Sequence, residues 1–187
     1  PAVAGTAVVF GPAGPITFPD VSNPPAGLGS PAPSTIVVSG LGPSLTALTV
    51  TLTGISHPRP DDFDILLVGP EGQAILLMSD ACNGTSSIAS LTFQDGATAL
   101  PDSTTCDSGT YAPTNWPGGT SLRADQDDRP GGIIANSITL SAFVGTNPNG
   151  TWSLWVLDDH NGSGRAASIG GWSLDITADN VAPTLTD

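Results

Sequence analysis

Apolar and polar residues alternate along several short stretches of this chain. Between Ser44 and Thr53, Leu48, Val50 and Leu52 alternate with threonines, and this period of two predicts a strand with one buried face. Short runs of β-forming residues, each bounded by Gly, Pro, Asn or Asp, predict further strands at 63–69, 74–78, 138–143, 151–157 and 172–177, and weaker ones at 6–10, 35–39 and 90–93. No stretch has a convincing helical period.

Turns separate these strands at regular intervals. Gly69-Pro70-Glu71-Gly72 lies between two apolar runs and predicts a tight hairpin turn. About eight or nine strands connected in this way predict an all-β, two-sheet jelly-roll sandwich. Residues 94–130 contain few strand-forming residues, so we expect a long loop there, and long ordered loops are usually functional or tied down.

The charge balance favours some partners over others. The formal net charge is -13, the chain has no Lys, and every acid except Glu71 is Asp. Nucleic acid is an unsuitable partner, because a phosphate backbone needs a basic surface and the four Arg are scattered among acids. Clustered Asp residues suit a hard cation bound by loops, although an acidic, solvated surface explains the total charge equally well.

Cys82 and Cys106 form an even pair without the His or additional Cys of a zinc site. We expect a disulfide, which indicates an oxidising compartment and anchors the long loop with a stabilisation of roughly 3 kcal/mol. Two buried thiols are the alternative. No stretch reaches the roughly 18 apolar residues of a membrane span, so the chain is expected to be soluble, with any targeting segment removed or not included.

Strand ends carry the candidate metal ligands. Asp62 and Asp64 are two residues apart, and on a strand their carboxylates would point to the same side. Asp158 and Asp159 end another strand, and loops at one end of a sandwich could bring Asp80, Asp95 and Asp102 to the same place. Calcium takes six to eight oxygen ligands, which this set and backbone carbonyls could supply. Alternatively, these Asp side chains accept hydrogen bonds within their own turns.

Catalytic motifs are scarce. His57 and His160 are the only histidines, and neither lies in a motif that identifies a partner serine or a metal. We expect both to be loop residues and the protein not to be an enzyme. Trp152 and Trp155 should lie on opposite faces of one strand, so Trp155, like Trp116 in the long loop, is either a binding aromatic or a residue buried under loops.

Two segments together resemble a family. Residues Leu48–Met78 and Asn149–Thr177 are similar to the P, or Homo B, domain of proprotein convertases, particularly to versions in secreted bacterial proteins. The likeness lies in an acid-led strand with a GP-x-G turn (Asp62–Gly72), a P-x-G-x-W-x-L strand (Pro148–Leu154) and a closing W-x-L strand (Gly170–Leu174). The resemblance implies a non-catalytic jelly-roll sandwich that accompanies other domains and often binds calcium.

Taken together, these features predict an N-terminal extension at 1–15, a P-domain-like sandwich at 16–178 and a C-terminal tail or linker at 179–187. We expect an extracellular or cell-surface, calcium-binding structural or adhesive module whose partners are copies of itself or adjacent β-domains. If the tails add a strand to a neighbour's open sheet edge, the module would form filaments. A carbohydrate- or peptide-binding accessory module of a secreted enzyme, or the P domain of a subtilisin-like protease, is the alternative.

Overall fold

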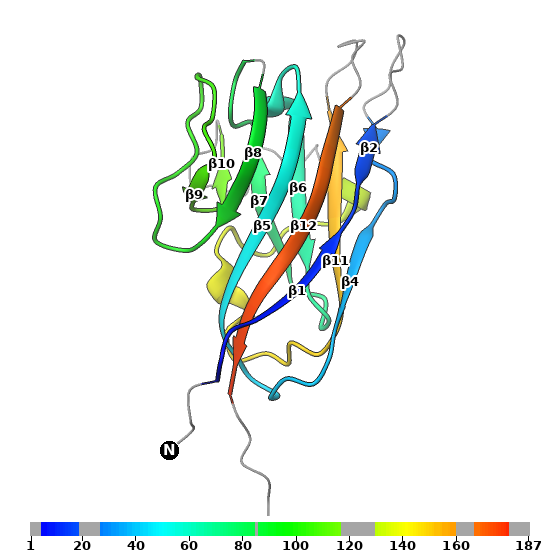
Figure 1. Ribbon diagram of the computed structural model, residues 1–187, viewed down its shortest axis with the longest axis vertical. Helices are drawn as coiled ribbons and strands as arrows, with labels where there is room; N and C mark the ends of the chain where they lie inside the picture. The colour runs from blue at the N-terminus through cyan, green and yellow to red at the C-terminus, as the bar shows by residue number, and fades with distance from the viewer. Residues whose placement is uncertain (1–4, 19–26, 85, 117–129, 160–166, 180–187) are drawn as a thin grey trace, which may run out of the picture.

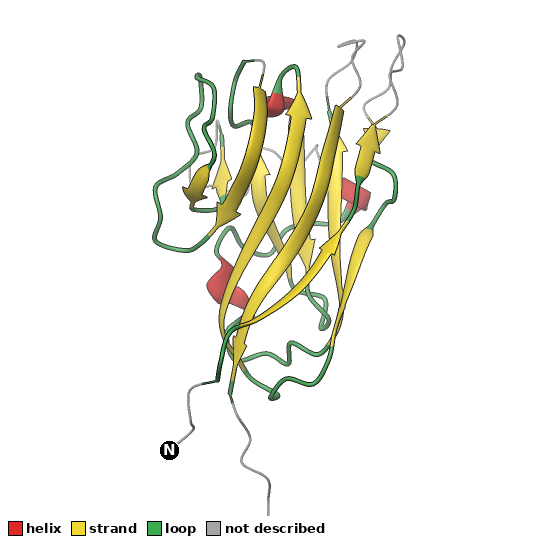
Figure 2. Cartoon of the chain, in the orientation of Figure 1, coloured by secondary structure: helices red, strands yellow, loops and turns green. Residues whose placement is uncertain are grey.

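The computed structural model describes residues 5–18, 27–84, 86–116, 130–159 and 167–179 of the 187-residue chain. These ranges contain twelve strands and three short 3₁₀ helices. The strands form two sheets that pack face to face (Figures 1 and 2). The predicted all-β sandwich is confirmed, and the additional strands beyond the expected eight or nine are all two or three residues long.

Each sheet has six strands. The first has the order β1 (Val8–Ala13), β12 (Ala167–Ala178), β5 (Leu45–His57), β8 (Ser86–Phe93) and β9 (Gly109–Tyr111), and β2 (Ile16–Phe18) also pairs with β12. The second has the order β10 (Thr114–Asn115), β7 (Ala74–Ser79), β6 (Phe63–Val68), β11 (Gly150–Asp158) and β3 (Gly27–Leu28), and β4 (Ser34–Val38) also pairs with β11. All pairs are antiparallel except β8 with β9 and β7 with β10, which makes both sheets mixed.

The main core fills the space between the sheets. Leu48, Val50 and Leu52 of β5 are buried there, as their alternation with threonine predicts. Trp152 and Trp172 are fully buried, and each indole N–H donates a hydrogen bond, to the carbonyl of Pro148 and the hydroxyl of Ser34 respectively, both at 2.9 Å. Their polar atoms are therefore satisfied inside the core.

A second apolar cluster covers the outer face of the second sheet. Leu66, Ala74 and Leu76 are buried in this cluster, and Trp155 packs against them. Residues 130–138 cross this face and contribute Ile133, Ala135 and Ile138. Trp152 and Trp155 thus lie on opposite faces of β11, as predicted, and Trp155 is a packing residue of this cluster.

One predicted strand is not a strand. The last four residues of the apolar run 138–143 form the 3₁₀ helix η3 (Leu140–Phe143). The Asp95 carboxylate accepts hydrogen bonds from the backbone N–H groups of Leu140 at 2.8 Å and Ser141 at 2.7 Å. A side chain distant in sequence therefore satisfies the first N–H groups of this turn, in the way that an N-cap residue does.

The predicted disulfide between Cys82 and Cys106 is present. The base of its loop is also held by hydrogen bonds from the N–H of Cys82 to the carbonyl of Pro101 at 2.9 Å and from the N–H of Asn83 to the carbonyl of Asp102 at 3.2 Å. Among the residues that the structure describes, no helix has the length and apolar character needed to cross a membrane.

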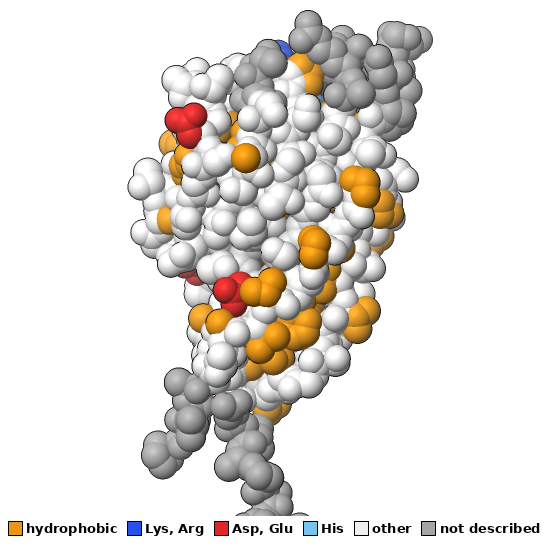
Figure 3. Space-filling model, in the orientation of Figure 1, with side chains coloured by type: hydrophobic (Ala, Val, Ile, Leu, Met, Phe, Trp, Pro, Cys, Tyr) orange, Lys and Arg blue, Asp and Glu red, His pale blue; other side chains and the backbone are white. Residues whose placement is uncertain are grey.

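The N-terminal extension takes part in the sandwich. Its strand β1 pairs with β12 of the same chain, Val8 opposite Ile176 and Phe10 opposite Leu174. Val8–Ala13 is therefore an edge strand of its own chain's sheet, and the expected addition of the N-terminal tail to a neighbour's sheet does not apply to this segment. Residues 180–187 of the C-terminal tail lie outside the described residues. On the face seen in Figure 3, hydrophobic side chains gather on the side of β1 and β4, where Val9 and Val37 are exposed.

Candidate metal centre

At one end of the sandwich, β5 and β11 end and β6 begins. Strand β5 of the first sheet ends at His57, and the chain turns through the 3₁₀ helix η1 (Pro60–Asp62) into β6 of the second sheet. Strand β11 runs beside β6 with Asp158 opposite Phe63. Pairing in this register places the last carboxylate of β11 next to the turn that contains Asp62.

His57 is the central polar residue of this end. It is buried, with 2% exposed, and its ring packs against that of Phe63 with centroids 4.3 Å apart. Its Nδ1 accepts a hydrogen bond from the backbone N–H of Arg59 at 2.9 Å, and its Nε2 lies 3.1 Å from Oδ2 of Asp158. Because Nδ1 is an acceptor, the neutral ring carries its proton on Nε2 and donates it to Asp158.

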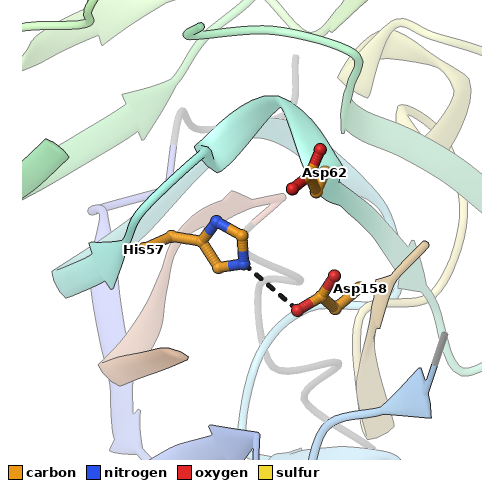
Figure 4. Close-up of side chains that lie close together, drawn as sticks. All are labelled: His57, Asp62 and Asp158. Carbon is orange, nitrogen blue, oxygen red and sulfur yellow. Dashed lines mark hydrogen bonds and ion pairs between the residues drawn. The ribbon is translucent and has the colours of Figure 1, made fainter. Parts of the chain in front are cut away.

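Asp62 and Asp158 face the same small space. One ligand atom from each of His57, Asp62 and Asp158 lies within 4.8 Å of the other two, and Figure 4 shows the three side chains converging there. Asp62 is buried, with 6% exposed. The backbone N–H of Asp159 donates to the carbonyl of Asp62 at 3.0 Å, which ties the end of β11 to η1.

Negative charge exceeds positive charge around this space. Arg59 is the only Lys or Arg among the described residues. Its Nη2 lies 3.1 Å from Oδ2 of Asp61 and its Nε 3.8 Å from Oδ1 of Asp62. The hydrogen bond to Asp61 is the main cause that raises the pKa of Arg59 above its usual value, followed by the fields of Asp62, Asp61 and Asp159.

The predicted ligands do not all meet here. Asp62 and Asp158 belong to the cluster. Asp159 contacts it through its backbone N–H, which donates a hydrogen bond to the backbone carbonyl of Asp62. Asp64 is buried, but it alternates with Phe63 and lies on the face of β6 that carries Leu66, the outer face of the second sheet. Asp62 precedes this strand and belongs to η1, so the alternation of faces along β6 does not include it.

The other predicted ligands lie elsewhere. Asp95 accepts hydrogen bonds from the backbone N–H groups at the start of η3, which is distant in sequence and is not its own turn. Asp80 follows β7 with a φ of 51° on the way to Cys82. Asp102 is exposed and accepts a hydrogen bond from Asn83 through its backbone carbonyl. Within the described residues, the metal-type cluster contains none of these three.

His57 was expected to be an ordinary loop residue, and this expectation was wrong. No local pattern identified it, because the alternation of Leu48, Val50 and Leu52 breaks at Thr53 and Gly54, which are both exposed, and burial resumes only at Ile55 and His57. The second histidine, His160, lies outside the described residues. Of the two candidate aromatics, Trp155 belongs to the outer apolar cluster and Trp116 is half-buried on the flank of the sandwich.

Comparison with known proteins gives the following. No family model matches the chain, so its resemblance to P domains stays a prediction. No curated protein matches it either. Two similar solved structures are the serine protease of Aeromonas sobria, with 17% identity and a TM-score of 0.43, and the complex of that protease with its chaperone, with 17% identity and a TM-score of 0.41. The similarity covers 92% and 94% of this chain but only 27% and 28% of the matched chains.

Proposed function

We propose that this chain is a non-catalytic, calcium-binding β-sandwich that acts as a structural module of a secreted or surface-exposed protein. The observation that carries the proposal is the convergence of the Asp62 and Asp158 carboxylates at the end of the sandwich, where His57 is hydrogen-bonded to Asp158. Among the described residues, this end holds Asp61, Asp62, Asp158 and Asp159 and one guanidinium, that of Arg59. A partly buried excess of carboxylates is stabilised by a cation.

The donor atoms fit calcium better than a transition metal. Calcium binds oxygen ligands at about 2.3–2.6 Å, so two ligands of one ion lie at most about 5 Å apart. The ligand atoms of the cluster lie within 4.8 Å of one another, which satisfies this requirement. Coordination by His57 would need a bare Nε2, whereas the acceptor role of Nδ1 places the proton on Nε2. His57 therefore orients the Asp158 carboxylate and leaves oxygen atoms as the ligands.

The same geometry supports a non-catalytic role. A histidine that acts as a general base uses one nitrogen for the substrate or nucleophile. In His57 one nitrogen contacts the backbone of Arg59 and the other contacts Asp158. Neither nitrogen is directed at a hydroxyl or thiol nucleophile.

A cation at this position would link η1, which connects the two sheets, to the end of β11 in the second sheet. Its carboxylates come from η1 and β11, and the histidine behind them comes from β5 of the other sheet. Because the unfolded chain does not hold these groups together, the free energy of calcium binding adds to the free energy of unfolding. The disulfide agrees with an oxidising, extracellular location, where calcium is abundant.

Thermal unfolding with calcium and with the chelator EGTA tests the proposal. At a calcium concentration of about 100 Kd, the folded state gains about 2.7 kcal/mol. For a chain of this size we expect the unfolding midpoint to rise by about 5–10 °C. Isothermal titration calorimetry with calcium alone should show saturable binding, and titration with zinc should show weaker binding.

Two variants make the test specific. Asp62→Asn should abolish the calcium-dependent rise, because it removes a carboxylate from the cluster. Asp175→Asn is the matched control, since Asp175 is exposed on β12, and it should respond like the unmodified protein. An unfolding midpoint that is equal in calcium and EGTA, or an equal rise in both variants, would contradict the proposal.

A further inference from the structure

A groove of about 510 Å³ lies on the flank of the sandwich, away from the candidate metal centre. Its lining residues lie between β8 and β9, between β9 and β10 and their flanks, and at the start of η3. Figure 1 shows β9 and β10, the edge strands of the two sheets, on this flank. A bridge between Ala99 and Ala112 closes one side. Its volume is within the range of about 300–1,000 Å³ that is usual for small-ligand sites.

One wall of the groove is apolar and rigid. Ala97, Ala99 and Pro113 line it together with the half-buried indole of Trp116. The indole Nε1–H donates a hydrogen bond to the carbonyl of Leu100 at 3.0 Å, which fixes the ring in place. A fixed indole next to small side chains offers a flat apolar surface to a ligand.

The segment that leads into η3 also lines the groove, and apart from Ile138 its lining residues are polar and uncharged. Thr139 and Ser141 line it, and the Ser141 hydroxyl donates to Oγ1 of Thr139 at 3.1 Å. Asp95 also lines the groove, held in place by the N–H groups at the start of η3. Carboxylate and hydroxyl oxygens can accept hydrogen bonds from ligand hydroxyl groups.

We propose that this groove binds a pyranose unit of a neutral glycan. A pyranose has an apolar face of C–H groups and an edge of hydroxyl groups, which match the Trp116 wall and the polar residues Thr139 and Ser141 respectively. The net charge of -13 and the Asp95 carboxylate disfavour an anionic glycan. The groove shares no residue with the cluster of His57, Asp62 and Asp158, so the proposal does not depend on calcium binding.

Isothermal titration calorimetry with defined oligosaccharides tests this proposal. The probes are cellohexaose, mannohexaose, laminarihexaose and chitohexaose, with polygalacturonate as the anionic glycan and decaproline as a peptide that could also contact an indole. We expect saturable binding of at least one neutral hexaose, both in calcium and in EGTA. Trp116→Ala should weaken that binding about tenfold or more, because it removes the stacking surface.

A second variant is needed because Trp116 also packs against the main core, so its removal could lower stability as well as binding. Ala99 is exposed, so Ala99→Arg fills the groove without disturbing the core and should also abolish binding. Val37→Ser is the control, since Val37 is 69% exposed on β4 and does not line the groove, and it should bind like the unmodified protein. The proposal is overturned if none of the neutral hexaoses binds at millimolar concentration, if Ala99→Arg binds as well as the control, or if only decaproline or polygalacturonate binds.

Discussion

Reduction of the disulfide between Cys82 and Cys106 should lower stability by an amount that follows from the loop that it closes. The two cysteines are 24 residues apart in sequence. The chain-entropy relation gives about 3.5 kcal/mol for a loop of this length. For a protein of this size, the unfolding midpoint should fall by about 7–14 °C.

Urea denaturation with and without a phosphine reductant measures this change. Because the reduced unfolded chain is less restricted and exposes more surface, the dependence of the unfolding free energy on urea concentration should also become steeper. The reduced protein should still fold, since the backbone hydrogen bonds at Cys82 and Asn83 hold the base of the loop independently of the sulfur atoms.

A double variant, Cys82→Ala with Cys106→Ala, serves as the control. It should be insensitive to the reductant, and it should be less stable than the reduced protein because both cysteines are buried in the main core and lose packing with their sulfur atoms. If the oxidised and reduced proteins have equal free energies of unfolding, the loop is already restricted in the unfolded chain and the entropy argument is refuted.

Three further predictions concern the site and its surroundings. His57→Phe should lower calcium affinity about 10–100-fold in calorimetric titration, because the Asp158 carboxylate loses its hydrogen-bond donor. An unchanged affinity would argue against an orienting role for His57. Gly131→Ala should be more destabilising in urea than Gly132→Ala. Both glycines have positive φ, of 65° and 71°, but only a Cβ at position 131 would lie 2.6 Å from the Trp155 ring. Equal losses of unfolding free energy in the two variants would exclude that contact. Asp95→Ala should cost about 0.5–2 kcal/mol, because two N–H groups of η3 lose their acceptor, and a loss near zero would mean that water replaces it.

Sequence periodicity predicted the strands that combine one buried and one exposed face. In β5 the alternation of Leu48, Val50 and Leu52 with threonine corresponds directly to the burial in the structure. The run 138–143 has a similar composition, but its backbone N–H groups at Leu140 and Ser141 donate hydrogen bonds to the Asp95 carboxylate, and no local sequence pattern indicates such a distant contact. The shortest strands were missed for a related reason, since two or three residues contain no period.

The candidate metal centre was predictable in part. Asp62 and Asp158 were identified as strand-end carboxylates, and strand pairing brings them together. Their common end could not be derived from spacing, because it depends on the register between β6 and β11. The expected i, i+2 relation between Asp62 and Asp64 assumes a continuous strand, whereas Asp62 ends a 3₁₀ turn and the strand begins only after it, at Phe63.

The pairing of β1 with β12 has a mechanical consequence. The two strands are antiparallel, so the start of β1 at Val8 lies beside the end of β12 near Ile176, at the opposite end of the sandwich from η1 (Figure 1). Tension applied through the chain at these two points pulls neighbouring strands apart sideways and breaks their hydrogen bonds one pair at a time. In a tandem array under load, this sheet edge would yield first and at low force, and each module would lengthen by releasing β1 while the rest of the sandwich stayed folded.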